Sequence, residues 1–189
     1  MEYESITSLK GQFLVAMPGL SDPNFSQTVT CICEHSGEGA MGLIINRAHD
    51  TLKSKDLYKE LGLDFVEEEA GKQVYIGGPV HIGEVFILHA PPFEWEGTVL
   101  INNELAVSNT KDIIRAIAMG NGPKKYMISL GCAGWGANQL ESEIRQNAWL
   151  TVPFSNDLIF DYPDVEKWSK SVERLGINPL LLSMSAGNA

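Results

Sequence analysis

Three side chains that can carry chemistry alternate along one short segment: Cys31, Cys33 and His35. In a β-strand every second side chain points to the same face, so this spacing predicts two thiols and an imidazole side by side. A histidine near a thiol can lower the pKa of the thiol and generate the nucleophilic thiolate. The segment therefore predicts a reactive Cys33 assisted by His35. The structural alternative is that both thiols are small core residues, since unpaired cysteine is among the most buried residue types.

Two glycine-dense segments could frame a ligand. One is Gly77-Gly78-Pro79, and the other covers residues 131–136 and includes Gly134 and Trp135. Neither fits a phosphate-binding loop or the dinucleotide fingerprint. Glycines permit close backbone approach, and Trp135 could form one wall of a pocket. The alternative is a tight strand-to-helix connection anchored by a buried tryptophan, where turn glycines are common.

Further polar residues near predicted turns complete the set of ligand-binding candidates: Glu34, Asn46, His89, Gln139 and Glu141. Each is more often structural than functional, and acidic residues at a helix start are explained by the helix dipole. A zinc site would need paired ligand spacings, which the cysteines and histidines lack. We therefore expect no metal and no cofactor. Hydrolase, zincin and kinase signatures do not occur in the sequence either.

The elements that must position these residues follow from hydrophobic periodicity and from glycine and proline stops. Helical spacing is clearest over residues 110–119, and it also occurs over 54–61, 139–147 and 163–175. The acidic run 67–69 is expected to be a solvated loop, and the tail after residue 178 is expected to be irregular. Strands are predicted over residues 13–15, 28–35, 40–46, 73–76, 85–88, 98–101, 126–130, 149–153 and 158–160.

This order of elements lacks regular βαβ alternation, which favours an α+β architecture. We predict one compact domain over residues 1–189, with a large coiled sheet, mixed or antiparallel, flanked by about three to four helices. A chain of 189 residues can bury a sufficient core without cross-links. No internal repeat or linker interrupts it.

Composition narrows the class of function. The net charge of −10 and the lack of a clustered basic footprint argue against direct nucleic-acid binding. No apolar run approaches the roughly 18–20 residues that span a bilayer, so no membrane association is expected. Three cysteines, an odd number, fit free thiols in a reducing compartment, and no secretory signal is visible. A soluble cytoplasmic protein is therefore expected.

Several short sequence blocks, spread in a fixed order along nearly the whole chain, match the pattern of a known family. They include Cys33-Glu34-His35, the run 39–47, Gly77-Gly78-Pro79-Val80, Ala133-Gly134-Trp135 and the run 139–144. Together these blocks resemble the AlgH/YqgE family of bacterial proteins. The resemblance implies a compact α+β fold with a coiled mixed sheet, a cytoplasmic location and no established activity. The chain departs from the family pattern at Cys31 and Cys132, where tyrosine is usual.

Three functional hypotheses follow. The first is a non-enzymatic regulatory or binding protein whose partner is a small molecule or another protein, because no complete catalytic constellation is present. The second is a thiol-dependent enzyme or redox sensor in which Cys33 is the nucleophile and His35 polarises it. The third, suggested by the label that some members of the resembled family carry, is an indirect role in transcription. The sequence does not identify a ligand or an oligomeric state.

Overall fold

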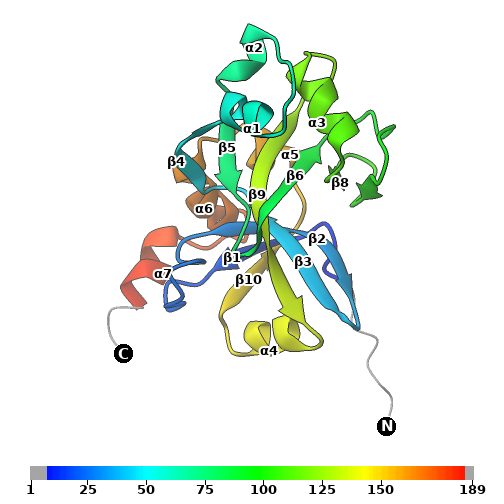
Figure 1. Ribbon diagram of the computed structural model, residues 1–189. Helices are drawn as coiled ribbons and strands as arrows, with labels where there is room; N and C mark the ends of the chain where they lie inside the picture. Colours follow the sequence, from blue (N-terminus) through cyan, green and yellow to red (C-terminus); the bar gives the residue numbers. More distant parts are fainter. Residues whose placement is uncertain (1–7, 186–189) are drawn as a thin grey trace.

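A computed structural model describes residues 8–185 of the protein. Ten strands form one coiled sheet with helices packed around it (Figure 1). The strands are β1 (Phe13–Ala16), β2 (Val29–Ser36), β3 (Gly39–Ile44), β4 (Ala48–Lys53), β5 (Gln73–Ile76), β6 (Val80–His89), β7 (Val99–Leu100), β8 (Ala106–Ser108), β9 (Tyr126–Gly136) and β10 (Trp149–Val152). The helices are α1 (Ser54–Glu60), α2 (Glu67–Ala70), α3 (Lys111–Ala118), α4 (Gln139–Arg145), α5 (Asn156–Phe160), α6 (Asp164–Glu173) and α7 (Pro179–Ser185).

The long strand β9 joins the two halves of the sheet. Its carboxyl-terminal half pairs with β3 of the half built from β10, β1, β2 and β3, with Gly42 opposite Ala133. Its amino-terminal half lies between β6, which is antiparallel to it, and β5, which is parallel to it. The single strand therefore changes partners along its length, and the sheet coils where this change occurs.

Close backbone approach at the change of partners requires glycine. A Cβ atom on Gly77 would lie 2.2 Å from the carbonyl oxygen of Gly131, and one on Gly78 would lie 2.2 Å from the carbonyl carbon of Cys132. Real Cβ atoms do not approach other heavy atoms so closely. Gly77 also donates its N–H to the Leu130 carbonyl and accepts from the Ile44 amide. The β5–β6 connection is thus hydrogen-bonded to both halves of the sheet.

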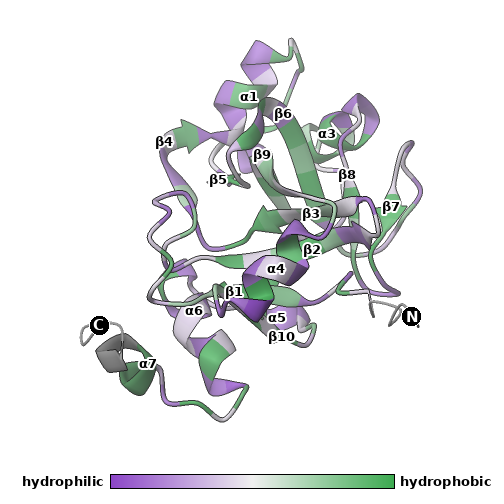
Figure 2. Ribbon diagram, turned by 90° about the horizontal axis from the view of Figure 1, so that it is seen from below, coloured by the Kyte–Doolittle hydropathy of each residue, from purple (hydrophilic) through white to green (hydrophobic). Residues whose placement is uncertain are grey.

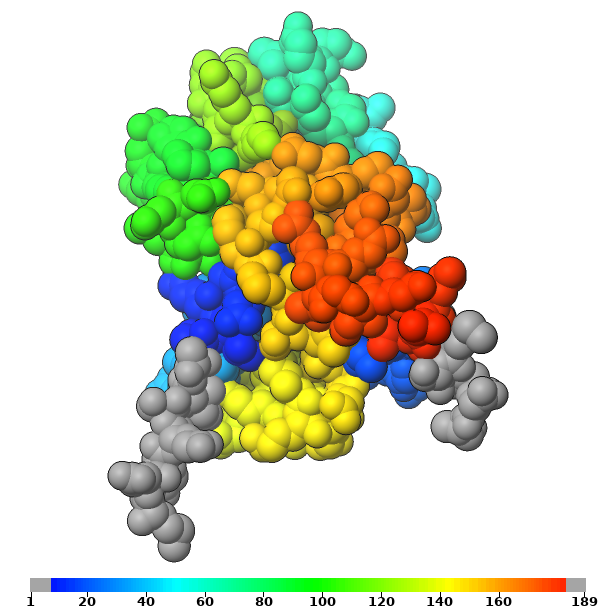
Figure 3. Space-filling model, turned by 180° about the vertical axis from the view of Figure 1, so that it is seen from behind, coloured from blue at the N-terminus to red at the C-terminus, as the bar shows by residue number. Residues whose placement is uncertain are grey.

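Three apolar clusters fill the molecule. The largest lies on one face of β1, β2 and β3 and is covered by α5 and α6, which include Leu158 and Val172. A second cluster is formed by one face of α3, with Ile113 and Ile117 packed against β5, β6 and β9. A third lies on the opposite face of the β1–β2–β3 half, beneath α4. Seen from behind, the segments that contain α5, α6 and α7, in orange to red, form much of the middle of the surface (Figure 3).

The predicted fold class is confirmed: the protein is one α+β domain built on a curled, mostly antiparallel sheet. The four predicted helices are present as α1, α3, α4 and α6. Within residues 8–185 there are three further, short helices, α2, α5 and α7. They replace the predicted loop at 67–69, the predicted strand at 158–160 and the predicted irregular tail.

The prediction of a glycine loop at residues 131–136 is also wrong. The segment 131–136, expected to be a glycine loop, is the second half of strand β9. Gly131 adopts a φ of 69°, and the strand continues through it as it changes partners.

None of the helices within residues 8–185 combines the length and the apolar composition needed to cross a bilayer.

Candidate functional site

Helix α4 gathers six of the residues predicted as candidates. It follows β9 and lies against the half of the sheet that contains β2 and β3 (Figure 2). Leu140 and Ile144 of the helix pack into the third apolar cluster. The helix contributes Gln139 and Glu141 itself. The sheet places the other four beside or beneath it: Glu34, His35, Gly134 and Trp135. The candidates at this end of the molecule therefore share one neighbourhood, although 106 residues separate His35 from Glu141.

His35 is fixed by both of its ring nitrogens. The Leu9 amide donates to Nδ1 at 2.8 Å, and Nε2 lies 2.8 Å from Oε1 of Glu141. Because a backbone amide can only donate, Nδ1 is the acceptor and the ring proton sits on Nε2, where it is donated to the carboxylate. The side chain is only 2% exposed. His35 is thus a connecting residue that ties the chain before β1 and helix α4 to the end of β2.

The charge on Glu141 is favoured by its surroundings. Burial opposes ionisation of the carboxyl group, but the helix amide of Glu141, the hydrogen bond from His35 and the nearby Arg145 outweigh it, so the pKa of Glu141 is lowered. The carboxylate therefore remains charged over the physiological range. It sits in the first turn of α4, where the helix dipole also favours a negative charge.

Trp135 is held by a second carboxylate on the same helix. Oε2 of Glu143 accepts the indole N–H of Trp135 at 2.9 Å and that of Trp149 at 2.8 Å. Its other oxygen accepts from Nε2 of Gln139 at 2.9 Å, and Oε1 of Gln139 accepts the Gly136 amide at 3.0 Å. The two indoles and Phe25 contact one another at ring-centroid distances of 5.5–6.1 Å. The orientation of Trp135 is therefore rigidly set.

A groove opens beside this cluster, at the tip of the β2–β3 hairpin. We name it the hairpin groove; it has a volume of about 490 Å³ and is lined by Lys10, Glu34, His35, Ser36, Glu38, Gly39, Ala40, Met41 and Trp135. Glu34 and Glu38 are exposed. Neither carboxylate forms a hydrogen bond or an ion pair with another residue of the described chain. Two exposed carboxylates and one lysine line the groove, so its lining has a surplus of negative charge.

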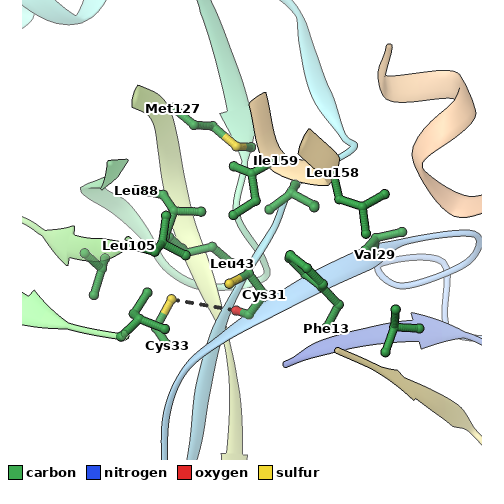
Figure 4. Packing of buried hydrophobic residues seen from close by; sticks show 14 of the residues in the cluster. Phe13, Val29, Cys31, Cys33, Leu43, Leu88, Leu105, Met127, Leu158 and Ile159 are labelled. Atoms are coloured by element: carbon green, nitrogen blue, oxygen red, sulfur yellow. Dashed lines mark hydrogen bonds between the residues drawn. The ribbon is translucent and has the colours of Figure 1, made fainter. Parts of the chain in front are cut away.

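The predicted pairing of Cys33 with His35 is wrong. Cys31 and Cys33 point into the largest apolar cluster, where Cys31 lies opposite Leu43 and Cys33 lies toward Leu105 (Figure 4). His35 instead pairs with Ala40, whose side chain belongs to the cluster beneath α4 on the other face. The physical reason is a β-bulge. The register with β3 shifts between Ile32 and Glu34, so the strand period is broken and the imidazole lies on the opposite face from the thiols.

The thiols also lack the environment of a nucleophile. All three cysteines are free and buried. Hydrogen bonding with Cys31, followed by burial, raises the pKa of the Cys33 thiol well above its ordinary value. The Cys33 Sγ is 3.7 Å from the Cys31 carbonyl oxygen. Burial, followed by the charge of Glu84, raises the pKa of Cys132. All three thiols are core residues, and for Cys31 and Cys33 this is what the structural alternative predicted.

Three other candidates lie elsewhere and have structural partners. Asn46 accepts the Val29 amide at 2.8 Å and donates to the Gln27 carbonyl at 2.9 Å, so it closes the entry to β2. Gly77 and Gly78 allow the close crossing of the sheet halves described above. None of the three borders the hairpin groove. Six of the predicted site residues therefore lie together around α4, whereas these three lie elsewhere and have structural roles.

His89 belongs to a buried polar chain. Its Nδ1 donates to the Ala90 carbonyl at 2.9 Å, which leaves Nε2 to accept from the Ser108 hydroxyl at 3.0 Å. Ser108 in turn lies 2.8 Å from the Thr98 hydroxyl. Burial, partly offset by the Ala90 carbonyl, lowers the pKa of His89. The neutral imidazole links β6 to β8 and does not touch the hairpin groove.

Three contributors to this neighbourhood were not among the predicted candidates. Lys10 and Glu38 line the groove, and Glu143 holds both indoles. Glu143 lies four residues after Gln139, so helical spacing could have placed the two side chains on one face. Nothing local to Lys10 or Glu38 signals a groove. Within the described part of the chain, no three His, Cys, Asp or Glu side chains converge in a way that could hold a metal ion.

Comparison with known proteins places nearly the whole chain in one family. The model of the AlgH-like family matches residues 13–180. A UPF0301 protein of Desulforapulum autotrophicum is 47% identical over 177 residues, which cover 94% of each chain. Another, from Methylococcus capsulatus, is 41% identical and covers 95% of this chain and 96% of its own length. The names of these relatives state no activity, substrate or partner.

Two solved structures share the fold. The solution structure of the AlgH protein from Pseudomonas aeruginosa is 44% identical, covers the full length of both chains and superposes with a TM-score of 0.79. A protein from Corynebacterium diphtheriae, at 21% identity, has a TM-score of 0.69 over 98% of this chain and 94% of its own, which shows a common fold alone. By sequence and by structure, this chain belongs to the AlgH-like family of proteins with no established activity.

Proposed function

We propose that the protein is a non-enzymatic binding protein whose ligand occupies the hairpin groove. The observation that carries the proposal is a pair of exposed carboxylates, Glu34 and Glu38, that have no partner within residues 8–185 and lie on the wall of a concave surface that Trp135 closes. Ligand sites are typically concave, with a few polar groups placed to fix orientation. A ligand with a cationic or strongly hydrogen-bond-donating group would satisfy the two carboxylates.

The support for binding over catalysis comes from the state of the reactive groups. The Cys33 thiol is buried with a raised pKa, and both ring nitrogens of His35 are already engaged. The surroundings of the groove are preorganised by Glu141 and Glu143, which reduces the entropy lost when a ligand binds.

The partner is a small organic cation or a basic segment of a protein. An indirect role in transcription would act through such a partner. Free thiols support a cytoplasmic location.

Titration of the ¹⁵N-labelled protein with small cations tests the proposal. Agmatine and spermidine are the probes, and their uncharged analogues are the reference. We expect chemical-shift changes at residues 34–41 and 135 with the cations only, weakened about tenfold in Glu34→Gln and Glu38→Gln. Glu94→Gln, an exposed carboxylate outside the groove, is the matched control. Absence of shifts with every probe, or equal weakening in the control, would refute the assignment.

A further inference from the structure

A second concave surface lies on another part of the molecule and carries the opposite charge. It has a volume of about 270 Å³, and the residues that matter are Lys72, Lys124, Lys125, Tyr75, Phe160 and Asp161. We name it the lysine pocket. Three of the 14 cationic side chains of a protein with a net charge of −10 gather here. With Asp161 as the acidic residue of the lining, the three lysines leave the pocket locally positive in a protein of negative net charge.

The topology of the sheet brings the lysines together. Strands β5 and β9 are parallel neighbours, with Val74 opposite Ile128. Their amino-terminal ends therefore lie at the same edge of the sheet. Lys72 precedes β5 by one residue, and Lys125 precedes β9 by one residue. The end of α5 closes the third side, and in Figure 3 the segments that contribute to the pocket, in teal, yellow-green and orange, adjoin on one face.

The ammonium groups remain available to a ligand. Lys124 is exposed and forms no hydrogen bond or ion pair with another residue within the described chain. Lys72 is 3.9 Å from Glu69, whose other carboxylate oxygen is occupied by the Tyr126 hydroxyl. Lys125 is paired with Asp161 at 2.9 Å, but both side chains are about half exposed, and exposed pairs of this kind contribute little stability. All three lysines can turn toward an anion.

Two aromatic rings add an apolar surface to the pocket. Tyr75 and Phe160 are half-buried. The Tyr75 hydroxyl donates to Asp164 at 3.3 Å, and burial, followed by that carboxylate, raises the pKa of Tyr75 to about 12. The phenol is therefore neutral and its ring is fixed. Nζ of Lys125 lies 5.9 Å from the centre of the Phe160 ring, so a cation and an aromatic face adjoin.

We propose that the lysine pocket binds a small phosphate monoester with a flat aromatic or heterocyclic group. Lysine is a point-charge ligand for phosphate, and the rings of Tyr75 and Phe160 would contact the flat group. A nucleic-acid strand is the less favoured occupant, because the negative charge of the rest of the molecule would repel its further phosphates. This site is separate from the hairpin groove, and the two share no residue.

Phenyl phosphate is the probe, with inorganic phosphate, phenol and a single-stranded oligonucleotide as comparisons. We expect phenyl phosphate to shift the amide signals of residues 72–75 and 124–128 and to bind more tightly than phosphate or phenol. Lys124→Ala and Lys125→Ala should each weaken binding about tenfold, while Lys170→Ala, which changes a partly exposed lysine on α6, should not. Signals of the hairpin groove should not move, which separates this test from the previous one.

Three outcomes would overturn the proposal. The first is absence of binding by phenyl phosphate to the full chain. The second is equal weakening by Lys170→Ala, which would show a non-specific effect of net charge. The third is tighter binding of the oligonucleotide, lost in Lys124→Ala, which would make the surface a nucleic-acid site.

Discussion

His35 and Glu141 join strand β2 to helix α4 through a hydrogen bond of 2.8 Å between Nε2 and Oε1. The bond is buried, with the imidazole 2% exposed and the carboxylate 13% exposed. It fixes one side of the hairpin groove to the helix that orders Trp135. The first prediction concerns the dependence of this connection on pH.

Replacing Glu141 with glutamine should remove a pH-dependent part of the stability. Because the folded-state pKa of Glu141 is lowered, its carboxylate stabilises the fold above the ordinary glutamate pKa, and this contribution is lost as the pH falls through the folded value. We expect Glu141→Gln to lower the free energy of unfolding by about 1–2 kcal/mol at pH 7. The difference from the unmodified protein should shrink at about pH 3. Urea unfolding at both values measures it, and an unchanged difference would contradict the ionic origin.

Glu143 should matter more for stability than its position on a surface helix indicates. Glu143→Ala leaves the indole N–H groups of Trp135 and Trp149 without their acceptor. We expect a loss of about 2–4 kcal/mol in the free energy of unfolding, from two partly buried donors. Glu143→Gln, which keeps an acceptor oxygen, should lose less. Tryptophan fluorescence during denaturant unfolding reports both values; equal effects of the two substitutions would contradict the acceptor role.

The thiol of Cys33 should be inert in the folded protein. Its burial and raised pKa predict alkylation by iodoacetamide at least about a hundredfold slower in the native protein than in urea, even at pH 8.5. Mass spectrometry of peptides after timed labelling measures each cysteine separately. Rapid labelling of Cys33 in the native state would instead restore the thiol-enzyme or redox-sensor hypothesis.

The crossing of the two sheet halves should tolerate no side chain at position 77. Gly77→Ala would place a methyl group 2.2 Å from the Gly131 carbonyl oxygen, so we expect a loss of about 3 kcal/mol or more, or failure to fold. Gly83→Ala is the matched control, because a Cβ atom there meets nothing within 4 Å. It should change the free energy of unfolding by less than about 0.5 kcal/mol. Thermal unfolding of both variants compares them, and a stable Gly77→Ala protein would refute the close crossing.

Local patterns in the sequence determined most of the elements. Residues 110–119 predict α3 because one helical face is apolar, and that face is the one buried against the sheet. Short apolar or β-branched runs bounded by turn residues predicted strands β2, β3, β5 and β10. The α+β class follows from the order of these elements, and ordered blocks along the chain were sufficient for the family.

Short segments were decided by their tertiary environment. The apolar run 158–160 was predicted as a strand, because a few apolar residues cannot distinguish a strand from one buried turn of helix. In the structure it forms α5, whose Leu158 and Ile159 cover the largest cluster. In the acidic run 67–69, Glu67 and Glu68 are exposed as predicted, but Glu69 accepts a hydrogen bond from the Tyr126 hydroxyl, 57 residues away.

The candidate site shows the same division between local pattern and long-range contact. The sequence identified the residue types around α4 and predicted His35, Trp135, Gln139 and Glu141 as candidates. It could not predict that a bulge between Ile32 and Glu34 turns His35 away from Cys33 and toward Glu141. A shift of one residue in a strand exchanges the two faces, and only the pairing of β2 with β3 fixes that shift. Residue types and periodicity are local properties, whereas the face on which each side chain lies is decided by strands distant in the chain.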